Sequence, residues 1–104
     1  MDYEVQYDHG FKYIETNPGK PVLLLLHGLF GALSNFKGIL HHFDQKLNVV
    51  VPILPIFELP ITEVSLEGLV QHVKEFTDFK EFLSVDLLGN SLGGHLAILY
   101  TLKY

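Results

Sequence analysis

The five residues from Val22 to Leu26 are all apolar and follow one another without a polar interruption. A strand with one solvated face alternates apolar and polar residues, so an unbroken run indicates a strand that is covered on both faces, as in a parallel sheet. Residues Asn48 to Ile53 form a second, β-branched run, and Ser84 to Leu88 form a third strand of this kind. The run at Val22 is far shorter than the roughly 20 residues that span a bilayer, so no membrane span is expected.

Helical patterns follow each of these runs. Ser34 or Asn35 can cap a helix that carries its apolar residues, from Phe36 to Phe43, on one face. Ser65 can cap a second helix that runs to about Phe79, and His95 to Lys103 continues as a mostly apolar third helix. Alternating strands and helices imply right-handed crossovers onto a parallel sheet, which places the chain in the α/β class.

An antiparallel hairpin is expected before the first apolar run. Residues Tyr3 to Tyr7 alternate with period two, Asp8-His9-Gly10 supplies turn residues, and Phe11 to Thr16 alternates again. The segment Asn17-Pro18-Gly19 ends this hairpin.

Composition and charge exclude several classes of partner. The chain has 104 residues, of which 48% are hydrophobic and 18% charged, which fits one small globular domain. Its net charge of −5, with scattered Lys and Arg, lacks the basic footprint that binds nucleic acid. Because the chain has no cysteine and an acidic start, we expect no disulfides, no secretory signal and a cytoplasmic location. The neighbouring His41 and His42 point apart on a helix, so no metal site is predicted, and nothing indicates a cofactor.

The sharpest chemical signal is Gly89-Asn90-Ser91-Leu92-Gly93-Gly94, a Gly-x-Ser-x-Gly pattern between an apolar strand and an apolar helix. A nucleophilic serine must project from a sharp turn, where a Cβ two residues before or after it would collide with the neighbouring strand or helix. Gly89 and Gly93 remove those Cβ atoms. The following helix directs unpaired N–H groups at the reacting centre, and the N–H of Leu92 is the expected oxyanion donor. The alternative is an ordinary strand-to-helix loop with a capping serine.

A second signal is His27-Gly28-Leu29-Phe30-Gly31, directly after the first apolar strand. Glycine at a strand end lets the backbone approach a bound ligand closely, which the second N–H donor of an oxyanion hole requires. Leu29 is the candidate donor, with Phe30 as a further candidate.

With these two motifs, the chain resembles the amino-terminal portion of the α/β-hydrolase fold superfamily, especially its small esterase-like members. The resemblance covers residues 1–104 as one partial domain and implies an edge hairpin followed by three parallel strands with helices on both faces. It further implies that Ser91 is the nucleophile, that the N–H groups of Leu29 and Leu92 form the oxyanion hole, and that His27 is structural. The glycines that support the two turns are Gly28, Gly89 and Gly93.

The chain departs from this family after Ser91. Family members place an Asp or Glu and then a His after the serine, whereas the only later histidine here is His95, which lies on the same helix. Without a base a serine hydroxyl is a poor nucleophile, so the chain alone is expected to be nearly inactive. The apolar, proline-rich segment from Pro52 to Ile61 suits a hydrophobic acyl substrate, and ordinary packing explains it equally well.

The resulting prediction is a serine hydrolase that acts on ester or related acyl substrates through a Ser91 acyl-enzyme. Alternatives are other reactions of the same scaffold, namely acyl transfer, carbon–carbon bond hydrolysis or a lyase step, and a non-catalytic fragment. The expected partner is a small hydrophobic acyl molecule. Because the third strand would leave a bare apolar edge, we also expect this segment alone to self-associate through that edge or to be only marginally stable.

Overall fold

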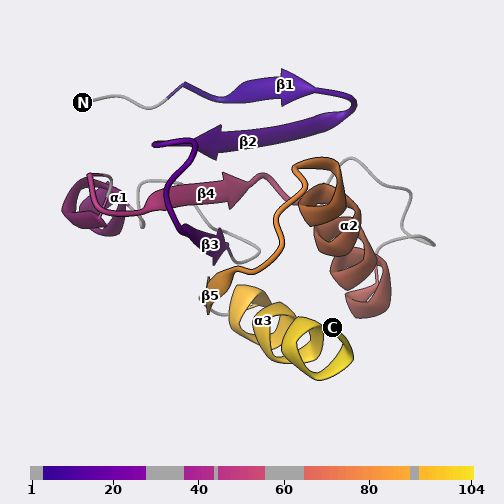
Figure 1. Cartoon of the computed structure of the whole chain (residues 1–104). Helices are drawn as coiled ribbons and strands as arrows, with labels where there is room; N and C mark the ends of the chain where they lie inside the picture. The colour runs from indigo at the N-terminus through magenta and orange to yellow at the C-terminus, as the bar shows by residue number, and fades with distance from the viewer. Residues whose placement is uncertain (1–3, 28–36, 44, 56–64, 90–91) are drawn as a thin grey trace.

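The computed structural model of the chain describes residues 4–27, 37–43, 45–55, 65–89 and 92–104. These residues form a five-stranded sheet with the strand order β1-β2-β4-β3-β5 and with helices on both faces (Figure 1). The strands are β1 (Gln6–Asp8), β2 (Phe11–Glu15), β3 (Val22–Leu26), β4 (Asn48–Pro52) and β5 (Asp86–Gly89), and the helices are α1 (Lys37–Phe43), α2 (Leu66–Phe79) and α3 (Leu92–Lys103). The predicted α/β class is confirmed.

The central strand β3 is covered on both faces. It pairs in parallel with β4 on one side and with β5 on the other, while β2 pairs antiparallel with β4. Leu24 and Leu26 pack in the cluster under α2 and α3, and Leu25 packs in the cluster under α1. All three leucines are fully buried, which is what their unbroken apolar run predicts.

Two of the three parallel strands have boundaries that differ from the prediction. The third parallel strand begins at Asp86 rather than Ser84. Because Leu23 pairs with Asp86, the same register would place Ser84 opposite Pro21, whose nitrogen carries no hydrogen to donate. The second strand, β4, ends at Pro52 instead of continuing through Ile53.

The hairpin of β1 and β2 lies at one edge of the sheet (Figure 1), as predicted. Its turn residues His9 and Gly10 both have positive φ, at 51° and 83°. Two positive values are typical of the two-residue turn that follows the right-handed twist of paired strands. The first strand is shorter than expected, since β1 covers Gln6–Asp8.

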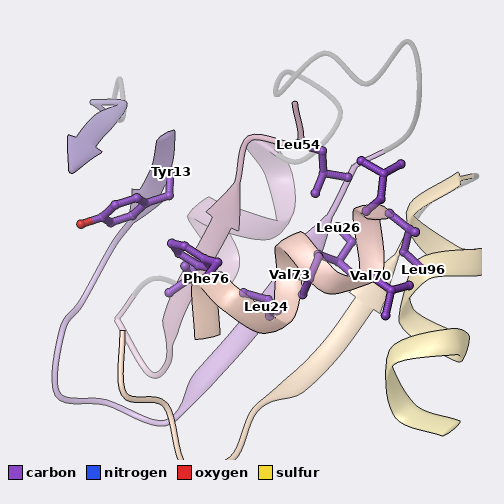
Figure 2. Packing of buried hydrophobic residues seen from close by; sticks show 10 residues of the cluster. Tyr13, Leu24, Leu26, Leu54, Val70, Val73, Phe76 and Leu96 are labelled. Carbon is purple, nitrogen blue, oxygen red and sulfur yellow. The ribbon is translucent and has the colours of Figure 1, made fainter. Parts of the chain in front are cut away.

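Helix α2 has the predicted boundaries. The Ser65 hydroxyl accepts a hydrogen bond from the Gly68 N–H at 2.9 Å and caps the helix start. Figure 2 shows Val70, Val73 and Phe76 of α2 packed among the buried side chains of the sheet. The spacing of these residues is the apolar stripe expected of a helix that covers a sheet.

A polar cluster joins the sheet to α2 at the amino-terminal end of the parallel strands. The Lys80 ammonium forms a 2.6 Å ion pair with one carboxylate oxygen of Glu15, and the Asn48 amide donates to the other oxygen at 2.8 Å. The Glu15 side chain is only 6% exposed. Burial lowers the pKa of Lys80, but the hydrogen bond and the charge of Glu15 outweigh it, so the pKa stays above the ordinary value of 10.5.

Candidate active site

The carboxyl ends of β3 and β5 form the best candidate site. These ends are level with each other because Leu26 pairs with Gly89. The helices lie on opposite faces of the sheet, with α1 against the cluster of Leu25 and α3 against that of Leu26 (Figure 1). In open α/β sheets, ligands bind in the crevice outside the carboxyl ends of neighbouring strands whose connections leave in opposite directions.

Both predicted motifs begin at these strand ends, since His27 follows β3 and Gly89 ends β5. The predicted nucleophile Ser91, the predicted donor Leu29 and Gly28 lie outside the described residues. The other predicted site residues are described, and they are His27, Gly89, Leu92 and Gly93.

The two glycines on either side of Ser91 lie in close backbone contact. A Cβ on Gly93 would overlap the Leu26 carbonyl and come within 2.9 Å of the His27 carbonyl oxygen. A Cβ on Gly89 would overlap the Gly93 carbonyl. The collision expected from the Gly-x-Ser-x-Gly spacing is thus confirmed: Gly93 meets the neighbouring strand and Gly89 meets the following helix.

The third glycine of the motif is under no such constraint. The closest atom to a Cβ on Gly94 would be the Gly89 carbonyl oxygen at 3.6 Å, which is ordinary van der Waals contact. Close packing therefore requires glycine at the two positions of the Gly-x-Ser-x-Gly pattern and not at its neighbour.

The helix after the serine turn starts earlier than predicted, at Leu92 rather than His95. Glycine disfavours helix by about 1 kcal/mol relative to alanine, which is why Gly93 and Gly94 were expected in the turn. The backbone contact of Gly93 with Leu26 offsets that preference. Because the first four N–H groups of a helix have no intrahelical acceptor, a start at Leu92 leaves its N–H available to a ligand at the positive end of the helix dipole.

The side chain of His27 makes a contact that the sequence did not predict. It is 7% exposed, and its Nε2 accepts a hydrogen bond from the Leu54 N–H at 2.8 Å. This bond links the chain after β3 to the chain after β4. No local signal could have paired two residues that lie so far apart in the sequence.

The remaining histidine of the motif region, His95, is exposed on α3. Within the described ranges, no group of three or more His, Asp or Glu side chains could hold a metal ion. The helices of those ranges also include none with the length and apolar character needed to cross a membrane.

No protein-family model matches the chain. Among solved structures, MGS-MChE2, an alpha/beta hydrolase enzyme from the metagenome of sediments from the lagoon of Mar Chica, Morocco, superposes with a TM-score of 0.91. The match is 37% identical in sequence and covers 97% of this chain and 46% of that one. The chain has the fold of the amino-terminal part of an α/β-hydrolase.

Two curated proteins are similar to this chain. Mouse monoacylglycerol lipase ABHD6 is 30% identical over 117 residues, covering all of this chain and 34% of its own length. The probable alcohol acetyltransferase of Wickerhamomyces anomalus is 28% identical over 102 residues, covering 89% of this chain and 28% of its own length. The chain therefore spans about a third of the length of the curated relatives that it matches.

Proposed function

We propose that this chain carries the nucleophile and the oxyanion-binding amides of an acyl-processing enzyme. In this proposal the Ser91 oxygen attacks an acyl carbonyl carbon, and the carbonyl electron pair moves onto oxygen. The N–H groups of Leu29 and Leu92 donate to that oxyanion. The leaving alcohol departs with a proton, and water later releases the acyl group from Ser91.

The observation that carries this proposal is the crowding at Gly89 and Gly93. A capping serine needs no glycine two residues to either side, because an ordinary helix start has room for a Cβ. Two overlapping positions, each two residues from Ser91, are what a strained turn that projects its central side chain requires. The start of α3 at Leu92 supplies the N–H that such a turn directs at the carbonyl oxygen of the substrate.

The names of the relatives favour acyl chemistry. One is a lipase and another an acetyltransferase, and both reactions transfer an acyl group, to water or to an alcohol. We therefore propose hydrolysis of a hydrophobic ester as the reaction, with transfer of its acyl group to an alcohol as the second candidate. The proton of Ser91 must pass to a base, and the only histidine after Ser91 in this sequence, His95, is exposed on α3. Because helix geometry would carry the His95 side chain alongside the turn, we do not propose it as that base. We expect the 104-residue chain alone to be nearly inactive.

A fluorophosphonate reagent, followed by peptide mapping, tests the nucleophile. We expect Ser91 to be labelled faster than the exposed Ser84 and expect added imidazole, acting as an external base, to accelerate the labelling. The variant Ser91→Ala should lose the fast labelling, and the matched control Ser84→Ala should keep it. Equal labelling of both serines in the presence of imidazole would contradict the proposal.

We also propose that the chain self-associates through the outer edge of β5 and the neighbouring surface of α3. Among the described residues, β5 pairs only with β3. Ile98 and Leu102 of α3 are 63% and 80% exposed, although a helix that is apolar all round is normally buried. The occupant that we propose is a second copy, because α3 carries no acidic residue in a chain of net charge −5. The α3 part of this surface therefore adds no repulsion between carboxylates when two copies meet.

Sedimentation velocity tests this association. We expect a concentration-dependent dimer in the wild-type chain and a mainly monomeric Leu102→Glu variant. Tyr7 is exposed on β1 at the opposite edge of the sheet, so Tyr7→Glu is the matched control and should still dimerise. A wild-type chain that remains monomeric at its highest soluble concentration contradicts the proposal.

A further inference from the structure

His27 places a polar imidazole ring at a buried position next to apolar residues. It directly follows the fully buried Leu24, Leu25 and Leu26 and is itself buried. A buried polar group is costly unless it is hydrogen-bonded. Its Nε2 accepts the Leu54 N–H at 2.8 Å, so in the neutral ring the hydrogen is carried by Nδ1.

Leu54 needs an acceptor because β4 and β3 have stopped pairing there. The preceding amide, Ile53 N–H, donates to the Lys12 carbonyl of β2 at 2.8 Å. Successive amides of an extended chain point to opposite neighbours, so the Leu54 N–H faces the side of β3. The described pairs of β3 with β4 end at Leu24 and Val50. The imidazole thus replaces the strand carbonyl that a continued ladder would have provided.

The backbone of His27 lies against the start of α3, the helix that follows β5. Its carbonyl oxygen lies 2.9 Å from the position that a Cβ on Gly93 would take, so the first turn of α3 packs directly on it. One residue therefore contacts the chain after β4 through its side chain and the start of α3 through its backbone.

We infer that His27 is a positioning residue whose neutral, Nδ1-protonated imidazole fixes the backbone that leaves β3 relative to the ends of β4 and β5. The side chain must be an acceptor at Nε2, which distinguishes this role from simple filling of space. An imidazolium, or the tautomer with hydrogen on Nε2, would present a donor to the Leu54 N–H. One part of this inference rests on the proposed function: the chain that follows His27 leads to Leu29, whose N–H is the proposed second oxyanion donor.

The tautomer is the first test, and it requires no variant. Two-bond ¹H–¹⁵N correlation spectra of the ¹⁵N-labelled chain at neutral pH distinguish the protonated from the unprotonated ring nitrogen. We expect His27 to be neutral with hydrogen on Nδ1, and we expect slow exchange of the Leu54 amide. Hydrogen on Nε2, or a protonated ring, overturns the inference.

Substitutions at His27 are the second test. His27→Gln can keep an acceptor near the position of Nε2, whereas His27→Leu fills the space without one. We expect the Leu54 amide to exchange at least about tenfold faster in His27→Leu and to be largely protected in His27→Gln. The control His41→Leu, at an exposed position on α1, should leave Leu54 unchanged. Unchanged exchange in His27→Leu overturns the inference.

Labelling of Ser91 separates this inference from the proposed function. If both hold, the labelling rate falls in His27→Leu and is restored in His27→Gln. If the amide exchange behaves as expected but Ser91 is never labelled preferentially, the positioning role stands and the proposed nucleophile is wrong. If labelling is specific but is insensitive to both His27 variants, the nucleophile stands and the positioning role is wrong.

Discussion

The two ends of the parallel strands are held together by different means. At the carboxyl end, Gly89 and Gly93 bring backbone against backbone, and the contacts exist because side-chain atoms are absent. At the amino end, Glu15 and Lys80 form a buried ion pair that Asn48 completes. The first end is sensitive to the size of a side chain, and the second to its charge.

This difference fits the proposed function. In that proposal a substrate carbonyl comes within hydrogen-bond distance of main-chain amides at the carboxyl end, so side chains there would obstruct it. Nothing has to approach the amino end, and its charged groups can be enclosed. Under the proposed function, the site and its structural support therefore lie at opposite ends of one sheet.

The largest effect is expected at Gly93. The variant Gly93→Ala should lose about 3 kcal/mol or more of unfolding free energy, because the new Cβ overlaps the Leu26 carbonyl. Gly94→Ala is the matched control, and it should be neutral or up to about 1 kcal/mol more stable, since alanine favours helix. Urea unfolding measures both. Similar losses in the two variants would show that close packing does not distinguish these glycines.

Breaking the ion pair at the other end should have the next largest effect. Glu15→Gln and Lys80→Met should each cost about 2 kcal/mol, because each leaves a partly buried polar group without its charged partner. The double variant should cost less than the sum of the two. Additive losses in this double-mutant cycle would mean that the two groups do not interact.

Helix α2 has Ser65 as its N-cap and Lys80 as its C-cap, and the Lys80 ammonium pairs with Glu15. Each end of the helix can therefore be weakened by its own substitution. Ser65→Ala should cost about 1 kcal/mol, because the Gly68 N–H loses its acceptor. Thermal unfolding should show this loss, whereas Ser84→Ala, at an exposed position outside any helix or strand, should leave the midpoint unchanged. Equal midpoints for Ser65→Ala and the wild type would exclude a stabilising cap.

The smallest effect concerns alkaline pH. Because the folded-state pKa of Lys80 lies above its ordinary value of 10.5, the stability it contributes is fully present below 10.5. That contribution is lost as the pH rises through the folded-state pKa. Unfolding free energies measured on both sides of pH 10.5 should therefore fall less steeply in Lys80→Met than in the wild type. Parallel slopes would contradict the assignment.

Periodicity and turn chemistry were sufficient to predict most of the fold. The unbroken apolar run predicted the two-sided burial of β3, and the stripe after Ser65 predicted α2 with its boundaries. These signals are local, because each depends on residues a few positions apart. The crowding at Gly89 and Gly93 was also predicted, from the Gly-x-Ser-x-Gly spacing alone.

The rest depended on contacts between distant parts of the chain. The predicted start of α3 at His95 was wrong, since the helix begins at Leu92. The low helix propensity of glycine was outweighed by the packing of Gly93 against β3. The pairing of His27 with Leu54 and that of Glu15 with Lys80 join separate elements. No periodic signal in the sequence links either pair, so only the assembled sheet and helices bring these partners together.

The central place of β3 has a kinetic consequence. Both of its partners come later in the sequence, and β5 is complete only when Gly89 has been synthesised. Until then Leu25 and Leu26 belong to a nascent chain whose middle strand lacks a neighbour on one side. Parallel pairing over such sequence separations forms slowly and leaves apolar edges open to aggregation. The step that gives β3 its second neighbour is thus the same step that brings Gly89, the first residue of the predicted serine motif, level with Leu26.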